Sequence, residues 1–334
     1  MTRRERVSAA IAHTQPDKVP YHLSFTAPAR DAMARWYGDP NFESSLGNCL
    51  LLLETEPKNS WRRVRDDIWE DQFGVQWDRT IDTDIGTVCN SPLASENIES
   101  YPFPDPLDPS RFEDWDAQIK SHADVFVVAS IGFSLFERAW TLAGMERVLM
   151  AMVDDNQFLS LLMDRILDFN LKLIEKACTY SIDAMRFGDD WGQQRGLIMG
   201  PVLWREIIGP RVRQMYGLVK SKGKKVFIHS CGKVDELFPD LIDSGLDVFN
   251  PFQPEVMDVY QVKQRYGDRL TFFGGISTQT TLPYGTDREV KDEVKRLMEG
   301  IGRNGGYIAS PAHDIPKDAR PENIAAMIEV LQGQ

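Results

Sequence analysis

Apolar and polar residues alternate along this chain with two different periods. From about residue 124 onward, short apolar runs predict six buried strands, at 125–131, 182–187, 225–230, 246–250, 270–275 and 306–310. The longer segments between and after them have apolar residues every three to four positions and predict helices, among them 201–222, 235–243, 258–266, 287–303 and 322–331. Strands that alternate with helices in this way are typical of a parallel sheet with crossover helices.

The first 120 residues show a less regular pattern. A helix is predicted at 3–13, the apolar segment 19–25 is a further strand candidate, and the proline-rich segment 101–109 is predicted to be an exposed connector. The six later strands, this segment and one more strand in the first part make the eight strands of a (β/α)8 TIM barrel. We therefore predict a single α/β barrel domain over 1–334, with an irregular N-terminal extension over 1–120. A doubly wound open sheet is the alternative, but the glycine-rich phosphate turn that it predicts after an early strand is missing.

Composition limits the classes of partner and the compartment. The chain carries 50 acidic and 38 basic residues, for a net charge of -12. Nucleic acids and anionic membranes are bound by basic surfaces, so neither is an expected partner. The four cysteines form no regular disulfide framework, and no apolar segment near the N-terminus resembles a secretory signal. Both observations favour a reducing compartment and a cytoplasmic protein.

Polar side chains gather just after the predicted strands. In a TIM barrel the active site lies at the carboxyl ends of the strands. Five successive strand ends here carry polar or metal-ligating residues, at 188–193, 229–232, 251–253, 276–278 and 311–314. A purely structural barrel needs no such residues there, so we interpret this end of the barrel as a functional site.

His229 and Cys231 form the sharpest of these groups. At positions i and i+2 across a strand end, both side chains point to the same side, into the barrel mouth. A thiolate and an imidazole suit Zn²⁺, and His313 at the end of the last strand is the best candidate for a third ligand. Three protein ligands with one open position are the pattern of a catalytic zinc site. Three carboxylates are candidates to fill or orient the remaining position: Glu137, Asp189 and Asp190.

Simpler explanations stay open for each of these residues. Cys231 fits a buried inert thiol, and His313 fits a hydrogen-bonded loop histidine or a proton carrier without metal. The acidic pair 189–190 fits a cap of the following turn. Glu137 fits an ion-pair partner of Arg138 on a helix surface.

Several of these segments together resemble the uroporphyrinogen decarboxylase superfamily. They are GDDWGQQ at 188–194, HSCG at 229–232, NPFQ at 250–253, FFGGIST at 272–278 and SPAHDIPKDARPENI at 310–324. The resemblance covers the chain from about residue 125 onward and is closest to the zinc-dependent, corrinoid-linked methyltransferases of the superfamily. It implies a (β/α)8 barrel with the active site in a deep funnel at the carboxyl ends of the strands.

The decarboxylase branch of the superfamily uses no metal, and it holds the carboxylates of its substrate with an arginine-rich N-terminal segment. In this chain the corresponding region, HLSFTAPARDAMARWYG at 22–38, offers only Arg30 and Arg35. His313 matches the position of the late histidine of the decarboxylases. The resemblance to this branch is therefore partial.

The methyltransferase branch carries H-x-C on one strand and a further cysteine in the last loop. His229 and Cys231 match the first part, and His313 stands where the further cysteine is expected. An imidazole at that position removes one negative charge from the ligand set, so a bound metal would stay more electrophilic. This favours Lewis-acid activation of a neutral ether or amine, or a lowered pKa for a bound thiol or hydroxyl.

The resemblance implies a zinc-dependent methyltransferase that moves a methyl group between a small substrate and a corrinoid. The substrate would be a methoxylated aromatic, a methylamine-type compound or a thiol, with Glu137 or Asp190 stabilising a leaving oxygen. The chain has no D-x-H-x-x-G corrinoid signature, so the corrinoid is expected on a separate partner protein. Four residues are candidates to contact the substrate: Trp191, Gln193, Asn250 and Gln253.

Two other functions are weighed against this one. The first is a metal-free decarboxylase for a tetrapyrrole or a smaller acid, with His313, Asp189 and Asp190 as proton carriers. The second is a non-catalytic barrel that binds a ligand or partner, which gives no reason for ionisable residues at so many strand ends. An oligomer is compatible with all three.

Overall fold

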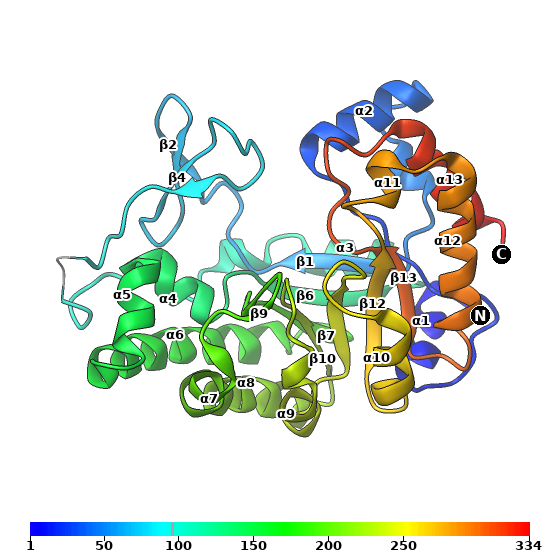
Figure 1. The fold of residues 1–334 in the computed structure, drawn as a ribbon. Coiled ribbons are helices and arrows are strands. Elements are labelled where there is room, and N and C mark those ends of the chain that lie inside the picture. Colours follow the sequence, from blue (N-terminus) through cyan, green and yellow to red (C-terminus); the bar gives the residue numbers. More distant parts are fainter. Residues whose placement is uncertain (95–96) are drawn as a thin grey trace.

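A seven-stranded parallel sheet curls around a central space and is the main feature of the computed structural model, which describes residues 1–94 and 97–334 (Figure 1). The strands are ordered β1-β6-β7-β10-β11-β12-β13. Their bounds are β1 Leu50–Glu54, β6 Phe126–Ile131, β7 Ala184–Gly188, β10 Lys225–His229, β11 Val248–Phe252, β12 Thr271–Ile276 and β13 Tyr307–Pro311. Every neighbouring pair is parallel, as the strand and helix alternation predicts.

The segment predicted as a strand at 19–25 closes this sheet. Tyr21 forms a parallel bridge with Ala309 of β13, and the Ala309 amide donates to the carbonyl of Pro20 at 2.8 Å. On the other side, the amide of Cys49, one residue before β1, donates to the Tyr21 carbonyl at 2.9 Å. The segment therefore joins both edges of the sheet, in the place of an eighth strand, and the predicted TIM-barrel class is confirmed.

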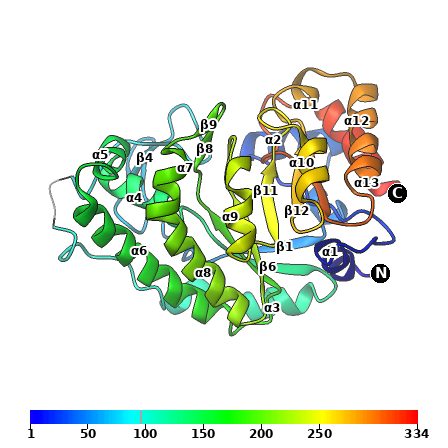
Figure 2. The ribbon, with the colours of Figure 1, turned by 60° about the horizontal axis from the view of Figure 1, so that its bottom comes forward.

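Helices surround the sheet: most pack on its outer side (Figure 2), and the others close its lower end or stand above it (Figure 1). Those of the first half are α1 Arg3–Ile11, α2 Ala27–Tyr37, α3 Trp115–Ser121, α4 Phe136–Ala143, α5 Met145–Ala151 and α6 Asn156–Ala177. Those of the second half are α7 Gly200–Leu203, α8 Gly209–Ser221, α9 Phe238–Asp243, α10 Val259–Tyr266, α11 Thr281–Tyr284, α12 Asp287–Gly300 and α13 Pro321–Gln332. A π-helical turn at Trp204–Ile208 joins α7 to α8, so the predicted helix 201–222 is one continuous helical segment. Among the described residues, no helix combines the length and the apolar run that spanning a membrane requires.

α1 closes the amino-terminal end of the barrel. Val7 and Ile11 of this helix pack onto the apolar residues inside the barrel, which include Leu50, Phe126, Val128, Phe227, Val248, Phe273 and Ile308. Arg4 forms an ion pair with Asp183 at the start of β7, at 2.5 Å, which fixes the helix across the strand ends. Apolar side chains thus fill the lower part of the barrel interior. The inward-facing polar residues lie at the carboxyl ends of the strands.

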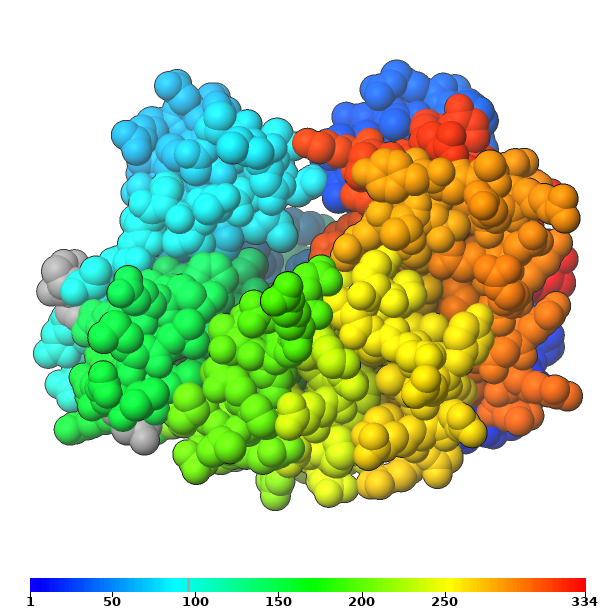
Figure 3. Space-filling view, viewed as in Figure 1, coloured from blue at the N-terminus to red at the C-terminus, as the bar shows by residue number. Residues whose placement is uncertain are grey.

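A small antiparallel sheet lies within the stretch expected to be irregular. Its strands pair in chain order and are β2 Arg62–Arg65, β3 Ile68–Glu70, β4 Gln76–Asp78 and β5 Thr87–Val88. This sheet stands above the barrel, opposite α2, α11 and α13 (Figure 1), and the space-filling view shows a deep hollow between the two raised parts (Figure 3). A further hairpin, β8 Gly192–Gln193 and β9 Gly196–Leu197, follows β7.

Candidate functional site

The upper end of the barrel interior is polar. Side chains on a strand alternate between its two faces, so a residue two positions after an inward apolar residue also points inward. The inward apolar residues on five neighbouring strands are Leu52, Val128, Ala184, Phe227 and Val248. Two positions later on each strand stands a polar residue: Glu54, Ser130, Arg186, His229 and Asn250. These five form the floor of the barrel mouth.

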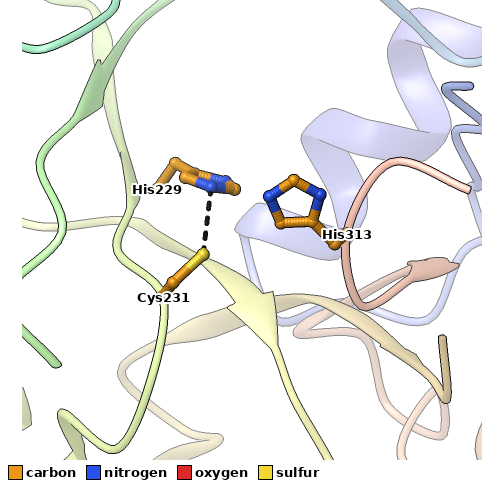
Figure 4. Close-up of side chains that lie close together, drawn as sticks. All are labelled: His229, Cys231 and His313. Carbon is orange, nitrogen blue, oxygen red and sulfur yellow. Dashed lines mark hydrogen bonds between the residues drawn. The ribbon is translucent and has the colours of Figure 1, made fainter. Parts of the chain in front are cut away.

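The three residues predicted as metal ligands lie together in this mouth (Figure 4). The ligand atoms of His229, Cys231 and His313 all lie within 4.8 Å of one another. The Cys231 Sγ is 3.5 Å from the His229 Nε2, and the two imidazole ring centroids are 5.4 Å apart. One sulfur and two imidazole nitrogens that converge in this way fit the ligand preference of Zn²⁺. His313 is exposed, so the point on which they converge is open to the mouth.

His229 is oriented by hydrogen bonds on the side away from Cys231. Its Nδ1 lies 2.6 Å from the Asn250 Oδ1, and the Asn250 Nδ2 donates to the Phe273 carbonyl at 3.0 Å, which fixes the orientation of the amide. Arg186 Nη2, which can only donate, lies farther from the Nδ1, at 3.0 Å. The shorter contact is to an amide oxygen, which only accepts, so it favours the proton on Nδ1 and leaves the Nε2 lone pair facing the thiol. Arg186 Nη2 donates a long hydrogen bond, of 3.4 Å, to the same Asn250 oxygen and so helps to fix the amide.

The loop that carries Cys231 is held by two side chains from neighbouring strand ends. Asp190 Oδ1 accepts a hydrogen bond from the Cys231 amide, and Gln253 Oε1 accepts one from the Gly232 amide, both at 2.7 Å. Gly232 has a φ of +84°, and a Cβ there would lie 2.4 Å from the carbonyl carbon of Gly192. The close approach of these two loops requires glycine. Asp190 and Gln253 therefore hold the backbone on either side of the cysteine. This positioning role adds to the catalytic role predicted for Asp190 and the substrate contact predicted for Gln253.

Asp189 lies beneath the site and caps the start of α4. Its carboxylate accepts hydrogen bonds from the amides of Leu135, Phe136 and Glu137, at 3.3, 3.1 and 2.8 Å. The Trp191 indole donates to it as well, at 2.6 Å. Burial raises the pKa of Asp189 to about 6 in spite of these donors. Asp189 is 1% exposed and Trp191 has no exposed surface, so neither faces the mouth directly.

Electrostatics near the cysteine favour a neutral site in the absence of a cation. Burial raises the pKa of Glu137 well above its ordinary value, and the nearby Asp190 raises it further. Burial and Asp190 also raise the pKa of the Cys231 thiol. Burial and Arg186 lower the pKa of His229 to about 4, so its imidazole is neutral. A divalent cation would supply the positive charge that turns the thiol into a ligand thiolate.

Gln193, predicted to contact the substrate, lies in the hairpin at the rim. Its side chain is exposed, and its carbonyl accepts a hydrogen bond from the Lys233 amide at 2.9 Å. This bond joins the hairpin to the loop that follows Cys231. Gln193 is therefore available to a ligand that enters the mouth from above.

The loop of His313 is tied to the first strand segment of the barrel. The Ile315 amide donates to the Ser24 carbonyl at 2.9 Å, and the Thr26 amide donates to the Ile315 carbonyl at 3.1 Å. The Ser24 hydroxyl also donates to the Asp314 carboxylate. The position of His313 thus depends on residues about 290 positions away in the sequence.

Sequence reasoning missed two charged residues on the floor of the mouth, Glu54 and Arg186. Glu54 is surrounded by protein although its side chain keeps solvent exposure, and this partial enclosure raises its pKa against the opposing effect of Arg186. The Arg186 guanidinium lies 3.0 Å from the His229 Nδ1. The alternation of side chains along each strand could have identified both residues, because each stands two positions after an inward-facing apolar residue and therefore also faces inward.

A cavity of about 340 Å³ lies beside the mouth, below the small antiparallel sheet. Glu54, Ser130 and Gly132 line it on the barrel side, and Trp61 and Arg79 line it on the side of the small sheet. None of the three predicted metal ligands belongs to its lining, so it is a separate space that shares Glu54 and Ser130 with the floor of the mouth.

Known proteins resemble this chain in sequence and in fold. It is 23% identical over 214 residues to a uroporphyrinogen decarboxylase of Methylococcus capsulatus, which covers 60% of this chain and 58% of the relative. It is 28% identical over 131 residues to the methylcobamide:CoM methyltransferase MtaA of Methanosarcina barkeri, which covers 39% of this chain and 36% of the relative. The chain thus matches less than two thirds of the length of either relative.

The fold as a whole also resembles that of a solved structure. A methyltransferase from Methanosarcina mazei superposes on 100% of this chain and 99% of its own length, with a TM-score of 0.74 and 17% sequence identity. The family model described as uroporphyrinogen decarboxylase (URO-D) matches residues 82–333, which include β6 to β13 and the converging His229, Cys231 and His313. The barrel, its polar mouth and this match together show that the chain belongs to the uroporphyrinogen decarboxylase family.

Proposed function

We propose that the chain is a zinc-dependent methyltransferase, which moves a methyl group between a small substrate and a corrinoid carried by a separate protein. The observation that carries this proposal is the convergence of His229, Cys231 and His313 within 4.8 Å at the open end of the barrel. The similarity to a methyltransferase named for methylcobamide supports the corrinoid as the second reactant.

The ligand set fits a zinc ion, which would act as a Lewis acid on the heteroatom that bears the methyl group, or hold an acceptor thiol as the thiolate. The residues of the chain prepare this position. Asn250 sets the tautomer of His229, and Asp190 and Gln253 hold the loop of Cys231. Glu137, whose pKa is raised, is the proposed proton donor to a leaving oxygen.

Metal analysis and methyl transfer, measured on the same preparations, test this proposal. The wild-type chain is expected to hold one zinc ion and to exchange methyl groups with free cob(I)alamin or methylcobalamin. Cys231→Ala is expected to lose both the zinc and the transfer. Cys89→Ala is the matched control, because Cys89 is an exposed cysteine next to β5, and it is expected to keep both. Zinc retained at the wild-type level in Cys231→Ala would refute the ligand assignment.

The second candidate function is a metal-free decarboxylase. The family match and the similarity to a uroporphyrinogen decarboxylase favour it, with His313, Asp189 and Asp190 as the proton carriers. It predicts that decarboxylation continues at full rate after chelation, whereas the methyltransferase loses activity with its metal. A barrel that only binds a ligand shows neither reaction.

A further inference from the structure

The cavity beside the mouth has the size of a pocket for a one-ring ligand. Its volume of about 340 Å³ stands near the small end of the range for small-molecule pockets, about 300–1,000 Å³. A substrate of four linked pyrrole rings exceeds this space. The cavity is lined by parts that are far apart in sequence, the small antiparallel sheet and the ends of β1 and β6. Figure 1 shows this sheet above the barrel strands.

Aromatic rings form the middle of the cavity wall. Phe73, Trp77 and Phe169 are buried, whereas Trp61 and Phe133 are partly exposed and offer ring surface. The Phe133 ring lies 5.1 Å from the Trp77 ring, centroid to centroid. Phe133 also has a φ of +48°, a left-handed conformation that is costly for a bulky residue. The surrounding structure imposes this conformation, and the result is an aromatic surface suited to a planar ligand ring.

One guanidinium group in the cavity is available to an anion. Arg138 is paired with the buried Asp71 at 2.8 Å, and Arg111 donates to two carbonyls and to a side-chain amide. Arg79 stacks on the Trp61 ring at 4.3 Å, and its Nε donates to one backbone carbonyl at 3.3 Å. Within residues 1–94 and 97–334, no carboxylate lies at ion-pair distance from Arg79.

The acidic residues of the cavity are engaged elsewhere. Glu56 accepts a hydrogen bond from the Trp61 indole at 3.2 Å, and Asp84 accepts one from the Ala27 amide at 2.9 Å. Glu54 stands at the opposite end, next to the barrel mouth. A planar guanidinium with two unused terminal nitrogens matches the geometry of a ligand carboxylate.

The barrel end of the cavity adjoins the metal ligands. Gly132 lines the cavity, and a Cβ on Gly188 would lie 3.5 Å from the Gly132 Cα. Gly188 is in turn the register partner of His229 across β7 and β10. Neighbouring strands lie about 4.8 Å apart, so about 10 Å separates Gly132 from His229. An aromatic ring with its substituents bridges a gap of that length.

We infer, building on the proposed methyltransferase, that its methyl donor is a one-ring aromatic carboxylate with a methyl ether. The ring lies against Phe133 and Trp61, the carboxylate binds Arg79, and the ether oxygen faces His229. In the transfer, the bond between the ether oxygen and the methyl carbon breaks, and its electron pair stays on the oxygen, which takes up one proton. The reduced cobalt of the partner's corrinoid supplies the electron pair of the new bond to the methyl carbon.

Ligand binding to the protein as purified tests the carboxylate subsite without any turnover. Three probes of similar shape differ in charge: 4-methoxybenzoate, methoxybenzene and 4-methoxybenzylamine. By calorimetry, the wild type is expected to bind the carboxylate at least about tenfold more tightly than the other two. Arg79→Met is expected to remove this preference and to leave methoxybenzene unaffected, whereas Arg213→Met, at an exposed position of α8, changes nothing. Equal affinities for the three probes, or a preference for the amine, would overturn the inference.

A steric variant tests the path between the cavity and the metal ligands. A Cβ on Gly132 meets no atom within 4 Å, so the backbone there has room for a side chain, and Gly132→Val adds bulk to the cavity. It is expected to weaken 4-methoxybenzoate binding at least about tenfold. Gly217→Ala is the matched control, since its Cβ also meets nothing within 4 Å, on the exposed side of α8. Unchanged binding in Gly132→Val would place the ligand elsewhere and overturn the inference.

The two proposals fail in different ways. If cob(I)alamin is methylated by methylamine-type donors or by methyl thioethers but 4-methoxybenzoate does not bind, the inference on the substrate is wrong and the methyltransferase stands. If 4-methoxybenzoate binds with the expected dependence on Arg79 but zinc and methyl transfer are absent, the methyltransferase is wrong and the ligand class of the cavity is supported.

Discussion

The Nδ1 of His229 lies 2.6 Å from the Oδ1 of Asn250, and this contact decides which ring nitrogen is available to a metal. Partners of this kind fix the tautomer and the orientation of a ligand histidine, and losing one typically costs about 10–100-fold in metal affinity. Asn250 is 6% exposed, and its amide nitrogen is bonded to the Phe273 carbonyl, so its orientation does not depend on a ligand.

Asn250→Ala is therefore expected to weaken zinc binding by about 10–100-fold, measured by competition with a chromophoric chelator. Asn250→Asp keeps an acceptor at the same place and is expected to retain zinc. The control is Asn41→Ala, an exposed asparagine whose side chain caps no helix. If Asn250→Ala bound zinc as tightly as the wild type, a role limited to substrate contact would remain for this residue.

The barrel and the convergence of the three candidate metal ligands are the parts that sequence alone predicts well. Buried strands leave a strong apolar signal, and the carboxyl ends of parallel strands must meet at one end of a barrel. This rule brings His229, Cys231 and His313 together although 82 residues separate the last two. The spacing of residues within one strand and the direction of the chain were enough for this part of the site.

Strand boundaries and buried polar contacts were harder to predict. The strand expected at 246–250 runs from Val248 to Phe252, so Asn250 stands in the middle of the strand rather than at its end. Trp191 follows a strand as predicted, but its indole bonds to the buried Asp189, and this contact turns it away from the mouth. Neither result follows from local sequence, because each depends on a partner in the folded chain.

The small antiparallel sheet left almost no signal in the sequence. Its strands are two to four residues long, and β2 is exposed along its whole length, so apolar alternation could not reveal it. Its side chains nevertheless form one wall of the cavity. The structure was therefore needed to find the part of the molecule on which the inferred choice of substrate depends.

Arg138 forms a buried ion pair with Asp71, rather than the surface pair with Glu137 considered from the sequence. Their side chains are 8% and 2% exposed, and the second oxygen of Asp71 accepts hydrogen bonds from the amides of Phe73 and Val75. Arg138→Met leaves the Asp71 charge buried without its partner. It is expected to lower the free energy of unfolding by about 3–5 kcal/mol, measured by urea denaturation.

The double variant Asp71→Leu with Arg138→Met tests the cause of this loss. It removes both charges and is expected to recover part of the stability. The exposed pair of Lys172 and Asp168 is the control, because Lys172→Ala should change the free energy of unfolding by less than about 1 kcal/mol. A loss in Arg138→Met no larger than that of the control would show that Asp71 does not need its partner.

The buried Lys263 makes the free energy of unfolding change with pH in the alkaline range. Its Nζ donates to the carbonyls of Gly305 and Gly306, at 2.7 and 3.0 Å, and burial lowers its pKa from 10.5 to about 8. Below pH 8 the lysine is charged in both the folded and the unfolded chain, so the folded state bears the full cost of burying the charge. Between pH 8 and 10.5 the folded chain has lost this proton and the unfolded chain still binds it. The contribution of Lys263 to stability therefore rises with pH across this window.

Lys263→Met removes the titrating group and keeps most of the apolar stem. The free energy of unfolding of the wild type, relative to that of this variant, is expected to rise as the pH goes from about 8 to about 10, since only the wild type loses the cost of the buried charge. Urea denaturation at a series of pH values measures the difference, and every other group that titrates in this range cancels between the two proteins. Lys172→Met, at an exposed position, should run parallel to the wild type. A constant difference between wild type and Lys263→Met would mean that Lys263 keeps its ordinary pKa in the folded chain.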